Sequence, residues 1–241
     1  MKKTLNFFIL LLSILATFNS QAQDEKLISK VLNKLNLKPK DVNMELIQTK
    51  VLPYAKEKTV LVIPKYETNQ DDVEFYVYDA YIVIADNQSG QILNKYFEKS
   101  KWTSDAIRLD GFTIDTGLYK LSDKVRAFGV RVSYTGSSRV NPYGATDLSL
   151  YIPTKNGLKQ IADEIKVENY SGEWDGNCNG EFQSEEITID IDNQKTNGFY
   201  NLILRNKITD TIATPKGDDC DEKISISNKT KKLKYNGITY E

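Results

Sequence analysis

Residues 175–186 are the segment whose residue types and spacing could do chemistry. They read Asp-Gly-Asn-Cys-Asn-Gly, then five residues, then a glutamate, which is the calcium-loop pattern of EF-hands. In that pattern side-chain oxygens converge on the ion, a glycine allows a sharp turn, and the last glutamate closes the shell. The predicted metal ligands are Asp175, Asn177, Asn179, Glu181 through its backbone carbonyl, and Glu186. Two asparagines in place of aspartates leave little ligand charge, so we expect weak binding, at about 10⁻⁴–10⁻³ M.

An ordinary turn is the alternative interpretation of this segment, because Asp, Asn and Gly favour turns for backbone reasons of their own. An EF-hand has a helix on each side of its loop, whereas residues 185–191 alternate like a strand. Calcium is therefore one of two interpretations.

Two cysteines bear on the same segment, since Cys178 lies inside it and Cys220 follows further along the chain. In an oxidising compartment an even number of thiols normally pairs. Both cysteines lie among polar residues rich in Gly and Asp, which favours a bridge between surface loops over two buried thiols. We predict a Cys178–Cys220 disulfide. It would bring two acidic stretches together, forming a patch for calcium or a basic partner, or a solvated acidic rim.

Histidine is absent from all 241 residues, which excludes many catalytic centres. Ser-His-Asp and Cys-His nucleophiles, HExxH metalloproteases and histidine-ligated zinc or haem sites all need it. The common serine-hydrolase, acyl-transfer and nucleotide-binding motifs are missing too. Asp190 and Asp192 share one strand face, whereas a glycosidase needs its two carboxylates across a cleft. The sequence therefore predicts no catalytic residue and no enzyme.

Charge and hydropathy restrict the partners and the location. The chain has 32 Lys+Arg against 33 Asp+Glu and no basic cluster, so we expect no nucleic-acid partner. Residues 1–22 read as a signal peptide, with a lysine head, an apolar run and a small-residue end at Ala22. That run is too short to cross a hydrocarbon core of about 30 Å, and no later segment is longer. We expect a periplasmic or secreted protein without a membrane span.

Strands are the elements that must position these residues. Residues 24–36 are predicted to form a helix instead, because Leu27, Val31 and Leu35 repeat at the helical period and Pro39 ends the pattern. From about residue 43, short β-branched and aromatic runs alternate with turn residues and no helical pattern intervenes. The sequence predicts an all-β fold, an antiparallel meander closing as a sandwich, barrel or small propeller, with one short N-terminal helix.

One domain is the simplest organisation, because no repeat and no Pro- or Ser-rich linker divides the chain. We predict a single β-rich domain over residues 23–241. Residues 165–241, which carry both cysteines, could form a disulfide-tied subdomain within it.

Four short segments resemble a family of uncharacterised exported proteins of Gram-negative bacteria. They are Arg-Ala-Phe-Gly-Val-Arg-Val at 126–132, Gly-Ser-Ser-Arg-Val-Asn-Pro-Tyr at 136–143, Thr-Asp-Leu-Ser-Leu-Tyr at 146–151, and Gly-Asn-Cys-Asn-Gly-Glu-Phe at 176–182. The resemblance implies an envelope location and a mostly β fold, and it implies no activity.

The leading functional hypothesis is an exported, non-enzymatic β domain that binds an envelope protein or an extracellular ligand and is stabilised by one disulfide, with calcium as a further stabiliser. The missing catalytic motifs motivate it. The alternative hypothesis is a secreted hydrolase that uses two carboxylates.

Overall fold

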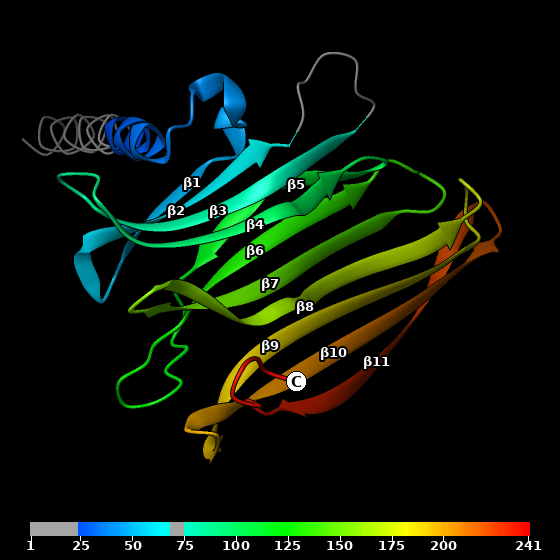
Figure 1. The fold of residues 1–241 in the computed structure, drawn as a ribbon. Coiled ribbons are helices and arrows are strands. Elements are labelled where there is room, and N and C mark those ends of the chain that lie inside the picture. The colour runs from blue at the N-terminus through cyan, green and yellow to red at the C-terminus, as the bar shows by residue number, and fades with distance from the viewer. Residues whose placement is uncertain (1–23, 68–74) are drawn as a thin grey trace, which may run out of the picture.

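The structure is a computed structural model that describes residues 24–67 and 75–241 (Figure 1). The predicted signal peptide, residues 1–22, lies outside the described residues. Within them, residues 24–35 form a helix, two short 3₁₀ helices follow at Pro39–Asp41 and Met44–Leu46, and the remaining elements are strands. The helix ends at Asn36, whose positive φ of 56° closes the last turn ahead of Pro39.

Two antiparallel sheets contain the strands (Figure 1). The smaller sheet has the order β1-β2-β3-β4, with bounds Gln48–Leu52, Ala55–Tyr66, Tyr76–Asp86 and Ile92–Ser104. The larger sheet has the order β11-β10-β9-β8-β7-β6-β5. Its bounds are Ile107–Asp115 (β5), Phe128–Gly136 (β6), Tyr143–Thr154 (β7), Gly157–Trp174 (β8), Gly180–Thr196 (β9), Phe199–Lys216 (β10) and Asp219–Leu233 (β11). The predicted all-β meander with an N-terminal helix is confirmed, and it closes as a sandwich.

The sandwich core lies between the smaller sheet and strands β5 to β7. Alternate residues of each strand face it, as the two-residue period of a strand requires. On β6 these residues are Phe128, Val130 and Val132, and on the facing sheet they include Val60, Val62, Ile82 and Trp102, all of them buried. The helix covers the other face of the smaller sheet, where Val31 packs in one cluster with Leu61 and Val83.

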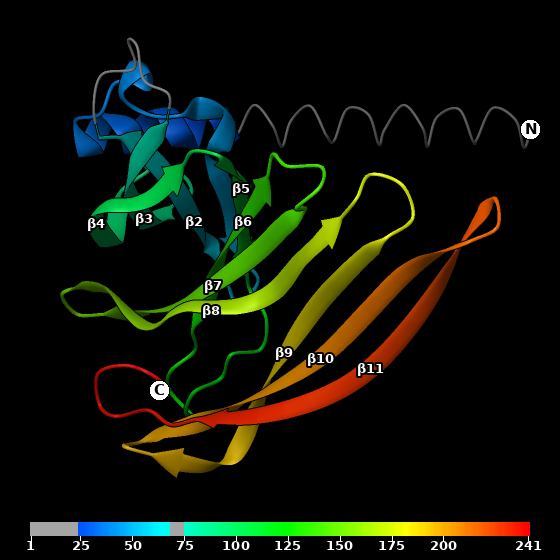
Figure 2. The same ribbon diagram turned by 90° about the vertical axis from the view of Figure 1, so that its right-hand side faces the viewer.

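Strand β8 divides the larger sheet. It pairs with β7 along its length, but it pairs with β9 only over Glu168–Glu186 to Trp174–Gly180. Below that point β9, β10 and β11 diverge from β8 (Figure 2). A second core fills the space between β8 and the diverging strands. It contains side chains of β7 and β8, such as Leu150 and Ile161, together with Leu202 and Leu204 of β10. The boundary predicted at residue 165 falls inside β8, and the subdomain stays a prediction.

A buried lysine connects the two sheets. The side chain of Lys101, on β4, is 6% exposed, and its Nζ lies 2.8 Å from Asp163, 3.3 Å from Glu164 and 3.5 Å from Glu98. Asp163 and Glu164 belong to β8, and Ser149 of β7 donates a hydrogen bond to Asp163. Burial lowers the pKa of Lys101, but the hydrogen bond to Asp163 and the three negative charges raise it above the ordinary lysine value overall. The lysine therefore stays charged between the sheets.

Lys101→Met should lower the free energy of unfolding by about 2 kcal/mol at neutral pH, because it leaves three partly exposed carboxylates close together without a cation and removes the hydrogen bond to Asp163. Chemical denaturation measures the loss. The raised pKa means that Lys101 contributes fully below about pH 10.4, and that its contribution is lost as pH rises through the folded-state pKa.

The control is Lys99→Met on the same strand, which removes an exposed ion pair with Glu67 and should cost under about 1 kcal/mol. Equal losses in the two variants would contradict the role given to Lys101.

Candidate functional site

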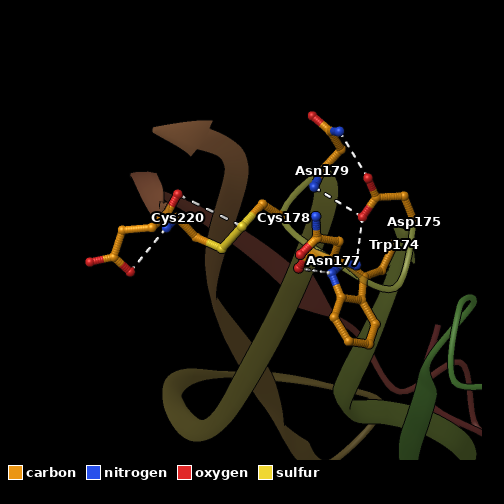
Figure 3. Close-up of a disulfide and its surroundings, with 7 residues drawn as sticks. Trp174, Asp175, Asn177, Cys178, Asn179 and Cys220 are labelled. Atoms are coloured by element: carbon orange, nitrogen blue, oxygen red, sulfur yellow. Dashed lines mark hydrogen bonds between the residues drawn. A yellow bond between two sulfur atoms is a disulfide. The ribbon is translucent and has the colours of Figure 1, made fainter. Parts of the chain in front are cut away.

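A disulfide connects two hairpin ends at one end of the larger sheet (Figure 3). Cys178 lies in the turn between β8 and β9, and Cys220 is the second residue of β11. Their Cα atoms are 5.5 Å apart and their sulfurs are at bonding distance, so the predicted pairing is confirmed. Because β9 and β10 are neighbours in the sheet, their turns emerge side by side, and the bridge fixes one turn against the other.

Asp175 organises the turn that carries Cys178. One of its carboxylate oxygens accepts hydrogen bonds from the backbone N–H groups of Asn177, at 2.8 Å, and Asn179, at 3.1 Å. The other oxygen accepts one from the Asn179 side-chain amide at 2.8 Å (Figure 3). These hydrogen bonds hold the pKa of Asp175 below its usual value, and the bond from the backbone N–H of Asn177 has the largest effect. The indole N–H of Trp174 donates to the Asn177 carbonyl and fixes the turn to β8.

The five predicted calcium ligands do not meet in this arrangement. Asp175, Asn177 and Asn179 share the turn, but Glu181 and Glu186 belong to the regular strand β9. Glu181 and Glu186 are five residues apart on this strand, which is a distance of roughly 17 Å. Because five is an odd number, their side chains lie on opposite faces of the sheet. Glu186 therefore cannot close a shell around Asp175. In the described part of the chain no group of three or more acidic or cysteine side chains could hold a metal ion. The residues as placed do not fit an EF-hand shell.

An open groove lies beside the disulfide-tied turns. It is formed by two adjoining hollows between the β6–β7 loop, the paired ends of β8 and β9, and β10. Its lining contains both acidic and apolar residues, and no lysine or arginine of the described residues is among them. The carboxylates are Glu173, Asp175, Glu181 and Asp210, and the exposed apolar side chains are Val140 and Ile212.

Two glutamates face each other directly across the groove strands. Glu173 of β8 is the register partner of Glu181 of β9, and both are exposed. Like charges in directly opposite positions destabilise a strand pair. A second pair, Glu168 and Glu186, faces the opposite side of the same two strands. The sheet therefore carries two unfavourable pairs, one of which lines the groove.

Phe182 packs across the β8–β9 pair next to the groove. Its ring lies over Gly172 on β8 and Gly180 on its own strand, and a Cβ at Gly172 would lie 2.3 Å from the ring. An aromatic ring over a cross-strand glycine fixes register. Tyr170 stacks nearly parallel to Phe182, with ring centroids 6.3 Å apart.

The pair Asp190 and Asp192 lies outside the groove, and both carboxylates are engaged. Asp190 forms an ion pair with Arg205, and Asp192 forms one with Lys232 at 2.7 Å. Sequence reasoning missed Val140, Asp210 and Ile212 as groove residues. No sequence pattern distinguishes these residues, because the loop before β7 and the register of β8, β9 and β10 bring them together.

For calcium, we expect Glu186→Gln to leave the response of the melting temperature to millimolar Ca²⁺ equal to that of the unmodified protein. The reason is that Glu186 lies six residues along the extended strand β9 from Gly180, and therefore far from Asp175 in the turn that precedes the strand. A calcium response that Glu186→Gln abolishes would instead show the turn rearranging around an ion, as the motif predicts.

For the disulfide, replacing both Cys178 and Cys220 by serine should lower the free energy of unfolding by about 4 kcal/mol, because it removes a covalent loop from the unfolded chain. Urea denaturation measures the loss. The unmodified protein under reducing conditions is the control and should match the variant. A variant as stable as the oxidised protein would contradict the prediction.

The chain matches no protein-family model, no curated protein and no solved structure.

Proposed function

We propose that this protein is an exported, non-enzymatic β domain that binds a basic, extended segment of an envelope or extracellular protein in the groove beside the disulfide. The observation that carries the proposal is the groove lining, which has four carboxylates and no described lysine or arginine. Such a lining attracts cations and repels anionic partners.

The apolar residues of the groove determine what kind of cation fits. Ile212 is 44% exposed, and with Val140 it offers apolar contacts beside the carboxylates. An extended peptide alternates its side chains from one face to the other. A lysine- or arginine-containing strand with apolar residues between its charges could therefore place cations near Glu173 and Glu181 and apolar groups on Ile212.

The paired glutamates support the same function. Repulsion between Glu173 and Glu181 costs stability in the free protein, and a bound cation between them would relieve it. Residues that destabilise the free fold and are compensated by a ligand are expected at binding sites.

The export part of the proposal rests on the leader and on the resemblance to exported proteins. The disulfide is compatible with an oxidising compartment. Within residues 24–67 and 75–241, none of the helices has the length and apolar character needed to cross a bilayer.

A carboxylate-based hydrolase is the second candidate, and the Glu173–Glu181 pair is the observation that favours it. Directly opposite residues of an antiparallel pair have Cβ atoms about 5 Å apart, so the two side chains can bring their carboxyl groups to the separation of about 5 Å that retaining glycosidases use. Hydrolysis of a glycan substrate that is lost in Glu181→Gln would establish this function in place of the first.

The binding test uses a fluorescent peptide of alternating lysine and valine. Glu173→Lys with Glu181→Lys should raise its dissociation constant about tenfold or more, because attraction becomes repulsion, and added salt should weaken binding to the unmodified protein. Fluorescence anisotropy measures both effects.

The matched control is Glu168→Lys with Glu186→Lys, which makes the same charge change on the opposite face of the same strands. It should leave peptide affinity within about twofold of the unmodified value. Equal weakening in both variants would show a general charge effect and would overturn the groove as the binding site.

A further inference from the structure

Strand β11 is an open edge of the larger sheet. It pairs with β10 on one side, and it is the outermost strand in Figures 1 and 2. All its residues except Leu233 are exposed. The pairing with β10 runs from Asp219 to Leu233 without a register shift, and the strand contains no proline. An edge that is long and regular, with no bulge or proline to interrupt it, is a template for adding another strand.

Charge along β11 is divided between its two halves. The first half begins with Asp219, Asp221 and Glu222, and the second half contains Lys229, Lys231 and Lys232. Lysines on an edge normally discourage pairing. Here an antiparallel copy of the same strand would place the acidic half of each chain against the basic half of the other.

We propose that the partner of this edge is a second copy of the chain, with two β11 strands pairing antiparallel about a two-fold axis at Ser225. Such an axis is perpendicular to the sheet, so the same face of the sheet is continuous across both chains. Each residue then lies opposite the partner residue that is equally far from Ser225 on the other side. With Ser225 opposite its own copy, Asp221 lies opposite Lys229 and Asp219 lies opposite Lys231. Symmetry repeats each of these pairs.

The other face of the strand agrees with the same register. Ile224 and Ile226 are 58% and 60% exposed, and each would lie opposite the other residue's copy in the partner. Paired β-branched residues stabilise antiparallel strands. On this face Glu222 would lie opposite Asn228, and on the face of Ser225 Lys223 would lie opposite Ser227, so no like charges meet. A centre one residue later, at Ile226, would put Lys223 opposite Lys229.

The two-fold pairing joins two seven-stranded sheets into one continuous sheet. None of the β11 residues lines the groove, so self-pairing leaves both grooves accessible. The proposal is therefore independent of the proposed function, and the two can fail separately.

Sedimentation equilibrium of the purified protein over about 1 µM to 1 mM tests the proposal. We expect a species with twice the mass of one chain, weakened by salt. Two variants reverse opposite halves of the strand: Lys229→Asp with Lys231→Asp, and Asp219→Lys with Asp221→Lys. Each alone should raise the dimer dissociation constant about tenfold or more, and mixing the two should restore a dimer. The restored mixture also shows that both variants are folded.

Lys56→Asp with Lys155→Asp is the control, since it makes the same charge change at exposed residues away from β11 and should stay dimeric. Hydrogen exchange provides a second measurement, because dimerisation should protect the outward-facing β11 amides. A single-chain species at every concentration would overturn the proposal and assign the edge to a different protein. Dimers that persist in both charge variants would overturn it as well.

Discussion

The unequal pairing of β8 with its two neighbours is the constraint on which the rest of the structure depends. Because β8 follows β7 throughout and β9 only at one end, the larger sheet is continuous there and divided elsewhere. The divided part creates the second core around Leu150 and Leu202. The continuous part holds the ends of β8, β9 and β10 in one surface, and the groove and the disulfide are both built there.

Local patterns made the element types predictable. The apolar spacing of Leu27, Val31 and Leu35 identified the helix, and β-branched runs such as residues 58–63 identified strands, because these signals depend on few neighbours. The length of β11 was not predictable. Its first half is polar and has weak strand propensity, so its extended conformation depends on the pairing with β10. Residues 238–241 are β-branched and aromatic in part, yet they contribute only the bridge between Tyr235 and Tyr240.

The candidate site was predictable only in part, for a related reason. The cysteine pairing followed from composition and compartment, whereas the calcium motif described spacing along the chain without the conformation of the chain. Once residues 180–196 are extended, Glu186 lies far from Asp175. The opposition of Glu173 and Glu181 depends on the register of two strands, which Phe182 over Gly172 helps to set. Lys101 gave no sequence signal, because two of its three carboxylate partners, Asp163 and Glu164, come from the other sheet.

The position of the disulfide also determines how mechanical force would pass through the molecule. The bridge spans 42 residues, and β9 and β10 lie wholly within the covalent loop that it closes. Tension applied to the C-terminal end would reach Cys220 through β11 and then cross directly to Cys178 at the end of β8. The covalent path through the sulfurs bypasses β9 and β10, so these two strands could not be extended end to end while the bridge holds. In a protein that bound a partner under shear, the groove strands would keep their register until the sulfur–sulfur bond was reduced.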